Sequence, residues 1–167
     1  AASDGDIVLV HPGNYDAGSR IHIDEKAITI GSLYLTTNDT SYISSTIITN
    51  SGNGGSLIEF EGVQEFFAKL TGFTITNGYV SSGSIFCDNS KVEISNCIIS
   101  DNYCIGSGGA ISFAYSEISL IDLTIVNNQA GGGNGGGING IGSSSYLKNV
   151  SIINNSANHG GGIFITA

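Results

Sequence analysis

Asp101 and Asp122 are the residues of this chain whose chemistry best suits catalysis. Acid–base cleavage of a polysaccharide needs two or three carboxylates at one place, and lyase chemistry adds Ca²⁺ with an arginine or lysine base. Asp101 follows the strand-like CIIS, and Asp122 directly precedes LTIV. Both positions are typical of turns, and the neighbouring segments supply no matching carboxylate. The sequence therefore favours a turn role for both aspartates and leaves catalysis as the alternative.

A second group of charged side chains could lie on neighbouring units of the fold. It comprises Glu93, Glu117, Lys91 and Lys148. Exposed ion pairs of this kind contribute little to stability, and a solvated charged surface is their simplest interpretation. Arg20 is a poor partner for an anionic polymer, because the chain carries a net charge of −9.

The histidines do not form a metal motif in the sequence. His11, His22 and His159 share no repeat position and no ligand spacing. Asp4 and Asp6 in DGD could contact a cation such as Ca²⁺, but a turn before the first apolar segment is the simpler interpretation. We therefore expect no metal site and no cofactor, with Ca²⁺ as the alternative left open.

The three cysteines also lack the spacing of a metal site or of a disulfide framework. Cys97 occupies the same position in its segment as Phe73 does in an earlier one, and Cys87 follows Ile85 as Phe113 follows Ile111. Because free cysteine behaves as a small buried hydrophobe, we expect Cys87 and Cys97 to fill the core. The sequence does not settle the redox state of Cys87, Cys97 and Cys104.

The elements that would position these residues repeat along the chain. Four related segments are FTITNG (73–78), CIISDN (97–102), LTIVNN (123–128) and VSIINN (150–155), and their middle isoleucines are separated by 24, 26 and 27 residues. A glycine run ending in isoleucine follows each of the last three segments, namely SGGAI, NGGGI and HGGGI. A recurring glycine run is a turn that an ordered fold needs, whereas a linker would be unrelated to its neighbours.

Composition excludes several classes of protein. Charged residues make up 11% of the 167 residues, only five are Lys or Arg, and 25 are glycine. The net negative charge opposes nucleic-acid binding, and no apolar run approaches the length of a membrane span. The short alternating apolar pattern is typical of many short strands. The sequence therefore predicts an all-β protein that neither binds nucleic acid nor spans a membrane in this segment.

Alternation within each repeat separates a buried set of side chains from an outward set. Stacking identical units of about this length produces a parallel β-solenoid, whose coils rise by the strand spacing of ~4.8 Å. Equivalent residues then form ladders from coil to coil. One such ladder, at the strand ends where a bend is expected, consists of Asn77, Asp101, Asn127 and Asn154.

The outward set contains aliphatic and hydroxyl side chains and lacks charge. The residues concerned are Ile47, Ile98, Val126 and Ile153, together with Thr74 and Thr76. A flat, uncharged surface of this kind indicates contact with another chain or ligand. The alternative is that a loop of the same chain, such as residues 34–42, covers it.

Two stretches resemble a known family. GGAI (108–111) and GGGI (135–138 and 160–163), with the preceding NNSAN, resemble the repeat of polymorphic outer membrane proteins and related autotransporter-type passengers. The opening DGDIVLVHPGNYDAGSRIHIDEKAITI is similar to the first coils of secreted right-handed β-helix, or pectin-lyase-like, proteins. The resemblance implies a right-handed parallel β-helix and a surface location, and it leaves activity open because this fold carries lyases, hydrolases, adhesins and fibres.

We therefore expect one β-helix domain over residues 1–167, with about six coils of roughly 24–27 residues. The first coils are expected in 1–60, and regular coils with Gly and Asn corners in 61–167, as part of a longer secreted or cell-surface protein. The first functional hypothesis is a non-catalytic protein for adhesion or surface assembly, which binds itself, other surface proteins or glycans. The alternatives are a self-assembling structural filament and a polysaccharide lyase or glycoside hydrolase.

Overall fold

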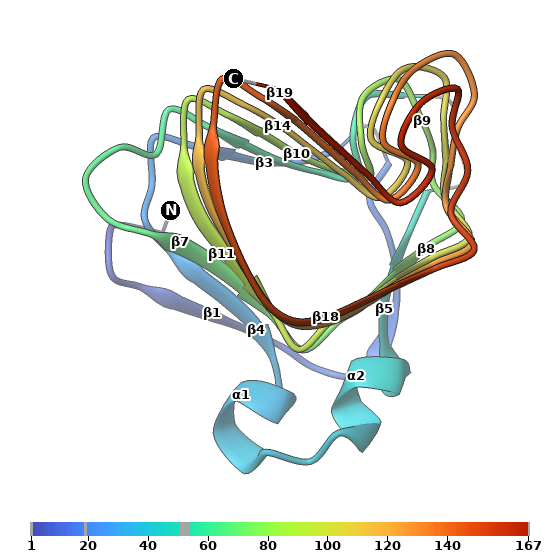
Figure 1. Cartoon of the computed structure of the whole chain (residues 1–167). Helices are drawn as coiled ribbons and strands as arrows, with labels where there is room; N and C mark the ends of the chain where they lie inside the picture. Colours follow the sequence, from blue (N-terminus) through green and yellow to red (C-terminus); the bar gives the residue numbers. More distant parts are fainter. Residues whose placement is uncertain (1, 19, 51–53, 167) are drawn as a thin grey trace.

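The chain folds as a parallel β-solenoid, as its repeats predict. The structure is a computed structural model that describes residues 2–18, 20–50 and 54–166. These residues wind into about six coils, and all the strand pairs between described strands are parallel. In Figure 1 the chain runs counter-clockwise from β11 through β18 and β8 to β9 and β14, and the red C-terminal coil lies nearest the viewer. The β-helix is therefore right-handed.

The first sheet has two faces that meet at a bend. One face contains, in coil order, β1 (Ile7–Val10), β4 (Thr29–Ser32), β7 (Ala68–Thr71), β11 (Lys91–Ser95) and the first halves of β15 (Glu117–Val126) and β18 (Ser144–Ile153). The other face contains β2 (Gly13–Asp16), β5 (Thr46–Thr49), β8 (Thr74–Thr76), β12 (Ile98–Ser100) and the second halves of β15 and β18. The bend falls at residues with positive φ, namely Gly72, Asn96, Asp122 and Asn149.

Two further sheets close each coil. The second sheet contains β3 (Ile21–Asp24), β6 (Ile58–Glu61), β10 (Ile85–Asp88), β14 (Ile111–Ala114), β17 (Ile138–Ile141) and β19 (Ile163–Thr166). The third sheet is short and contains β9 (Tyr79–Val80), β13 (Tyr103–Cys104) and β16 (Gln129–Ala130). The rings of Tyr79 and Tyr103 stack on its outer side with centroids 5.2 Å apart.

The core consists of ladders of apolar side chains that point into the coils. Ile75, Ile99 and Ile125 pair in register on adjacent strands, and each is fully buried. Burying one such side chain contributes roughly 1.5–3 kcal/mol before the entropy of ordering the chain is subtracted. Alternation in the sequence therefore selects which face of each strand turns inward, as the repeat pattern predicts.

The Asn corners combine a backbone bend with a ladder of amides. Asn77, Asp101, Asn127 and Asn154 have φ values of 56°, 55°, 57° and 53°. The residue that follows each of the last three points inward: Asn102 and Asn128 are buried, and the Asn128 side-chain amide donates to Oδ1 of Asn155 over 3.0 Å. The amides that bond one coil to the next thus lie mainly one position after the bend.

The glycine runs let the coil backbones approach one another closely. Gly135 has a φ of 64°, which glycine adopts without strain. A Cβ atom on Gly136 would collide with the carbonyl oxygens of Gly161 and Ser156 in the next coil. The GGG run is therefore an ordered corner in which side chains have no space.

An excursion from the second coil forms two short helices. α1 (Tyr34–Thr37) and α2 (Ser41–Ser45) lie between β4 and β5, outside the solenoid (Figure 1). The Tyr34 hydroxyl donates to Oδ1 of Asn96 over 3.0 Å, which ties the excursion to a later coil. None of the helices in the described ranges is long and apolar enough to cross a membrane.

Candidate functional site

The uncharged outward surface is formed by two parallel ladders, which we call the Ile/Thr face. Ile47, Thr74, Ile98, Thr124 and Ser151 form one ladder, and Thr76, Ser100, Val126 and Ile153 form the other. Every neighbouring pair within each ladder lies in register on adjacent strands, so the side chains form flat rows. Ser100 and Thr76 link their hydroxyls over 3.3 Å. The ladders bring together all six residues that the sequence proposes for an interface.

The excursion packs against the early coils of this face. The Thr74 hydroxyl donates to the carbonyl oxygen of Ile43 in α2 over 2.9 Å. A groove of about 220 Å³ separates α2 from the coils above, and Ile98 and Thr124 line it. The Ile/Thr face is thus covered by the chain itself over its first rows and is open at the last described coil, where Ile153 is 46% exposed.

Asp101 and Asp122 lie at opposite ends of the short strands of the Ile/Thr face. Asp101 follows β12, and Asp122 lies at the bend inside β15 with a φ of 54°. Oδ1 of Asp101 accepts from the Asn127 amide over 3.2 Å, and Oδ1 of Asp122 accepts from the Asn149 amide over 2.9 Å. Each aspartate thus takes part in its own corner ladder, and the two do not converge on one reacting centre.

The other charged candidates form separate ion pairs on the first face of the first sheet. Nζ of Lys69 lies 3.6 Å from Glu93, and Nζ of Lys91 lies 3.9 Å from Glu117. Lys148 pairs in register with Ile121 and lies beside neither glutamate. Because these pairs are exposed, each contributes between 0 and about 1 kcal/mol.

The cysteines are free, buried and poor nucleophiles. Desolvation raises the pKa of the Cys97 thiol to about 12, although the backbone at Phe73 and Gly72 partly offsets it. Burial raises the pKa values of Cys87 and Cys104 as well. A thiol reacts as the thiolate, so all three thiols are chemically protected in the folded protein.

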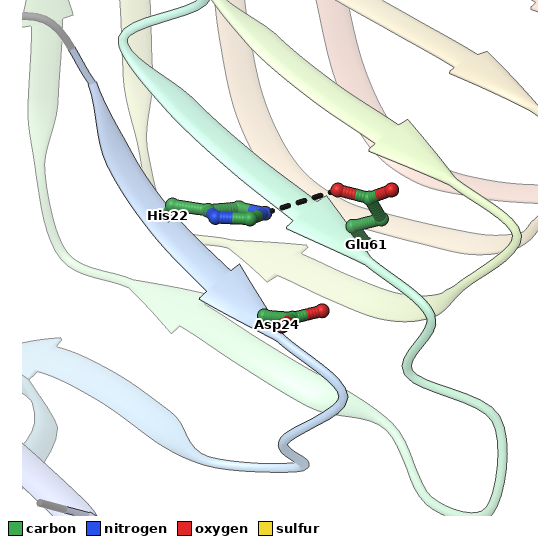
Figure 2. Close-up of side chains that lie close together, drawn as sticks. All are labelled: His22, Asp24 and Glu61. Atoms are coloured by element: carbon green, nitrogen blue, oxygen red, sulfur yellow. Dashed lines mark hydrogen bonds and ion pairs between the residues drawn. The ribbon is translucent and has the colours of Figure 1, made fainter.

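A cluster of His22, Asp24 and Glu61 lies on the outer side of the second sheet. His22 and Asp24 are outward residues of β3, and Glu61 is an outward residue of β6 in the next coil (Figure 2). Nε2 of His22 lies 3.2 Å from Oε2 of Glu61, and one possible ligand atom from each residue lies within 4.8 Å of the other two. All three residues are exposed. This donor set could hold a metal ion, and sequence analysis did not predict it.

The remaining polar candidates have other partners. Nδ1 of His159 lies 3.0 Å from Oδ1 of Asn134, far along the chain from His22. Oδ2 of Asp6 accepts from the Ser3 backbone amide over 2.7 Å, as in a turn. Oδ1 of Asp4 accepts from the Ala27 amide over 2.9 Å, which ties the start of the chain to the second coil.

Comparison of the chain with family models, with curated proteins and with solved structures found no match. The geometry of the Ile/Thr face and of the His22 cluster is therefore what argues for function.

Proposed function

We propose that the protein is a non-catalytic, secreted or cell-surface β-helix that serves adhesion or surface assembly, and that it associates with a second copy of itself through the Ile/Thr face. The observation that carries the proposal is that α2 already occupies the first rows of this face, while the same rows continue uncovered beyond it. The Thr74–Ile43 contact shows that a short polypeptide segment fits the surface.

The charge distribution restricts where a second copy can bind. The chain carries −9 at pH 7, so two copies repel each other over most of their surfaces. The rows from Ile47 to Ser151 and from Thr76 to Ile153 carry no charged side chain. Contact between these rows buries no carboxylate, and Asp101 and Asp122 lie at the two edges of the face. We expect association to strengthen as salt screens the remaining repulsion.

The likeness of the GGGI repeats to surface β-helix passengers supports the proposed location, and the separation of Asp101 from Asp122 supports a role without catalysis. The filament alternative would use a different surface. In that alternative, copies would join through strand edges at the ends of the solenoid rather than through the Ile/Thr face. Strand edges of this kind can add another copy end to end.

Sedimentation velocity over a range of protein concentrations tests the proposal. Val126→Asp places a charge in the Ile/Thr face without altering the last coil. Ile141→Asp is the matched control, because Ile141 is 45% exposed on the second sheet, almost as exposed as Ile153 at 46%. We expect Val126→Asp and Ile153→Asp each to weaken self-association at least roughly tenfold, or ~1.4 kcal/mol, while Ile141→Asp leaves it unchanged.

Two results would overturn the proposal. One is a wild-type chain that stays monomeric at every concentration, in which case binding to glycans or to other surface proteins becomes the alternative. The other is association that Val126→Asp leaves intact. Electron microscopy would then show whether the copies stack end to end as a filament.

A further inference from the structure

The His22 cluster joins the first coil to the second. β3 and β6 pair in parallel, with His22 opposite Glu59 and Asp24 opposite Glu61. His22 reaches diagonally to Glu61, so the cluster takes two residues from one strand and one from the next. Figure 2 shows the three side chains standing on the same side of the sheet, with Asp24 below the His22–Glu61 contact.

The outer side of the second sheet around Asp24 carries more negative than positive side chains. Asp24, Glu61 and Asp88 occupy one outward ladder on three successive strands, and like charges directly opposite one another destabilise a sheet. Arg20 does not relieve this ladder, because its guanidinium lies 2.6 Å from Glu59 instead. Among the described residues, the side chain of Asp24 has no hydrogen bond or ion pair, so it is free to bind an ion.

The distances suit a small transition-metal ion. Ligand atoms at about 2.0–2.2 Å from a tetrahedral Zn²⁺ lie roughly 3.3–3.6 Å from one another. The 3.2 Å between Nε2 of His22 and Oε2 of Glu61 is close to that spacing, and the cluster as a whole lies within 4.8 Å. A change of rotamer at exposed Asp24 would close the remaining distance.

We propose that His22, Asp24 and Glu61 bind a divalent transition-metal ion of the Zn²⁺ class, with water completing the coordination. One imidazole nitrogen and two carboxylate oxygens are ligands that Zn²⁺ accepts. Ca²⁺ takes six to eight oxygen ligands, so a site that contains an imidazole discriminates against it.

The bound ion acts as a clip between the first two coils. Among the described strands, β1 of the first coil pairs only with β4, and Ile7 in β1 is 64% exposed. Backbone bonds already link the coils beside the cluster, as where the Glu25 amide donates to the Glu61 carbonyl oxygen over 2.8 Å. A ligand that binds only the folded state stabilises it, so the metal holds β3 on β6 and slows the opening of the first coil.

Isothermal titration calorimetry of the protein, prepared without a polyhistidine tag, tests the site with Zn²⁺ and with Ca²⁺. We compare the wild type with His22→Ala and Asp24→Asn, and use His11→Ala as the matched control on the same coil. We expect one Zn²⁺ per chain, a loss of affinity of at least roughly tenfold in the first two variants, no change in His11→Ala, and no comparable Ca²⁺ binding.

Hydrogen exchange gives a readout that does not depend on affinity alone. We expect Zn²⁺ to slow amide exchange across β3 and β6 in the wild type and in His11→Ala, and to have no effect there in His22→Ala. The proposal is overturned if the wild type does not bind Zn²⁺, if His22→Ala binds it as tightly as the wild type, or if Ca²⁺ binds equally well. The last result would show a diffuse counterion effect of the acidic ladder.

Discussion

Replacing Asn128 by alanine should be among the most damaging single changes in the solenoid. The Asn128 side chain is fully buried at the corner after β15. Its Oδ1 accepts from the Asn102 backbone amide over 3.1 Å and from the Asn102 side-chain amide over 2.9 Å. Its Nδ2 donates to the Ile99 carbonyl oxygen over 2.9 Å and to Oδ1 of Asn155 over 3.0 Å. One side chain thus connects three coils.

The size of the effect follows from the groups left without partners. In Asn128→Ala the buried Asn102 backbone amide loses its acceptor, which costs about 1–3 kcal/mol. The side-chain amide of Asn102 keeps a bond to the Ile75 carbonyl oxygen at 3.2 Å, so its loss is smaller. Adding ~0.5–1.5 kcal/mol for each of the two Nδ2 bonds, to Ile99 and to Asn155, gives a destabilisation of roughly 2–6 kcal/mol. That is a large part of the roughly 5–15 kcal/mol that stabilises a typical domain.

Urea unfolding followed by far-UV circular dichroism measures this change, and Asn127→Gly is the control. Asn127 is adjacent and exposed, its φ of 57° suits glycine, and its amide makes a single surface bond to Asp101 at 3.2 Å. We expect Asn127→Gly to change the free energy of unfolding by less than about 1 kcal/mol. Equal unfolding midpoints for the two variants would refute the reasoning that the buried amide, rather than the bend, joins the coils.

Three other predictions follow from the packing of the corners and the core. Gly136→Ala should destabilise the fold by roughly 1–3 kcal/mol in the same urea assay, whereas Gly55→Ala, with no atom within 4 Å of the added Cβ, should be neutral or slightly stabilising. Ellman's reagent should label none of the three cysteines in the native protein and all of them in urea. Because the pKa of Cys97 is raised from 9.0 to about 12, the folded state keeps a proton that the unfolded chain releases. Stability from this thiol is therefore complete below pH 9 and declines as the pH rises toward 12, and Cys97→Val should flatten that decline. Equal unfolding midpoints for Gly136→Ala and Gly55→Ala would contradict the first of these predictions. Labelling of a cysteine in the native protein would contradict the second, and a decline in stability at alkaline pH that Cys97→Val leaves unchanged would contradict the third.

The regular coils could be predicted from the sequence because the interval between equivalent residues determines how adjacent strands pair. Ile75, Ile99 and Ile125 recur at nearly constant intervals, and the structure pairs them in that order. The exact position of the coil-to-coil bonds could not be predicted. Neighbouring asparagines such as Asn127 and Asn128 look alike in sequence, and only the backbone bend at Asn127 turns the next side chain inward.

The His22 cluster was missed because the interval between its strands is irregular. His22 and Glu61 are separated by 39 residues, whereas the amides of Asn102 and Asn128 that bond in the regular coils are 26 apart. The additional residues form the excursion that contains α1 and α2, which leaves and rejoins the coil between β4 and β5. With the excursion removed from the count, an outward His-x-Asp in one coil falls beside an outward Glu-x-Glu in the next. That alignment is the signal that could have found the cluster.

Departures from repetition are where a solenoid can carry function. In a ladder of identical residues, such as the buried isoleucines, each side chain packs against its equivalents in the neighbouring coils. Such a ladder has no atom available to bind a ligand. On the outer side of the second sheet the ladder from Asp24 to Glu61 and Asp88 changes to Ala114 and Ile141, so its negative charge is confined to the first coils. In the Ile/Thr face, α2 covers the first rows, and the last row, Ser151 and Ile153, is open. The two proposed sites thus lie in different coils, the cation site in the first two and the association surface in the last of the described coils. If Zn²⁺ changes the stability of the first coil while self-association responds only to substitutions in the Ile/Thr face, the two sites act independently.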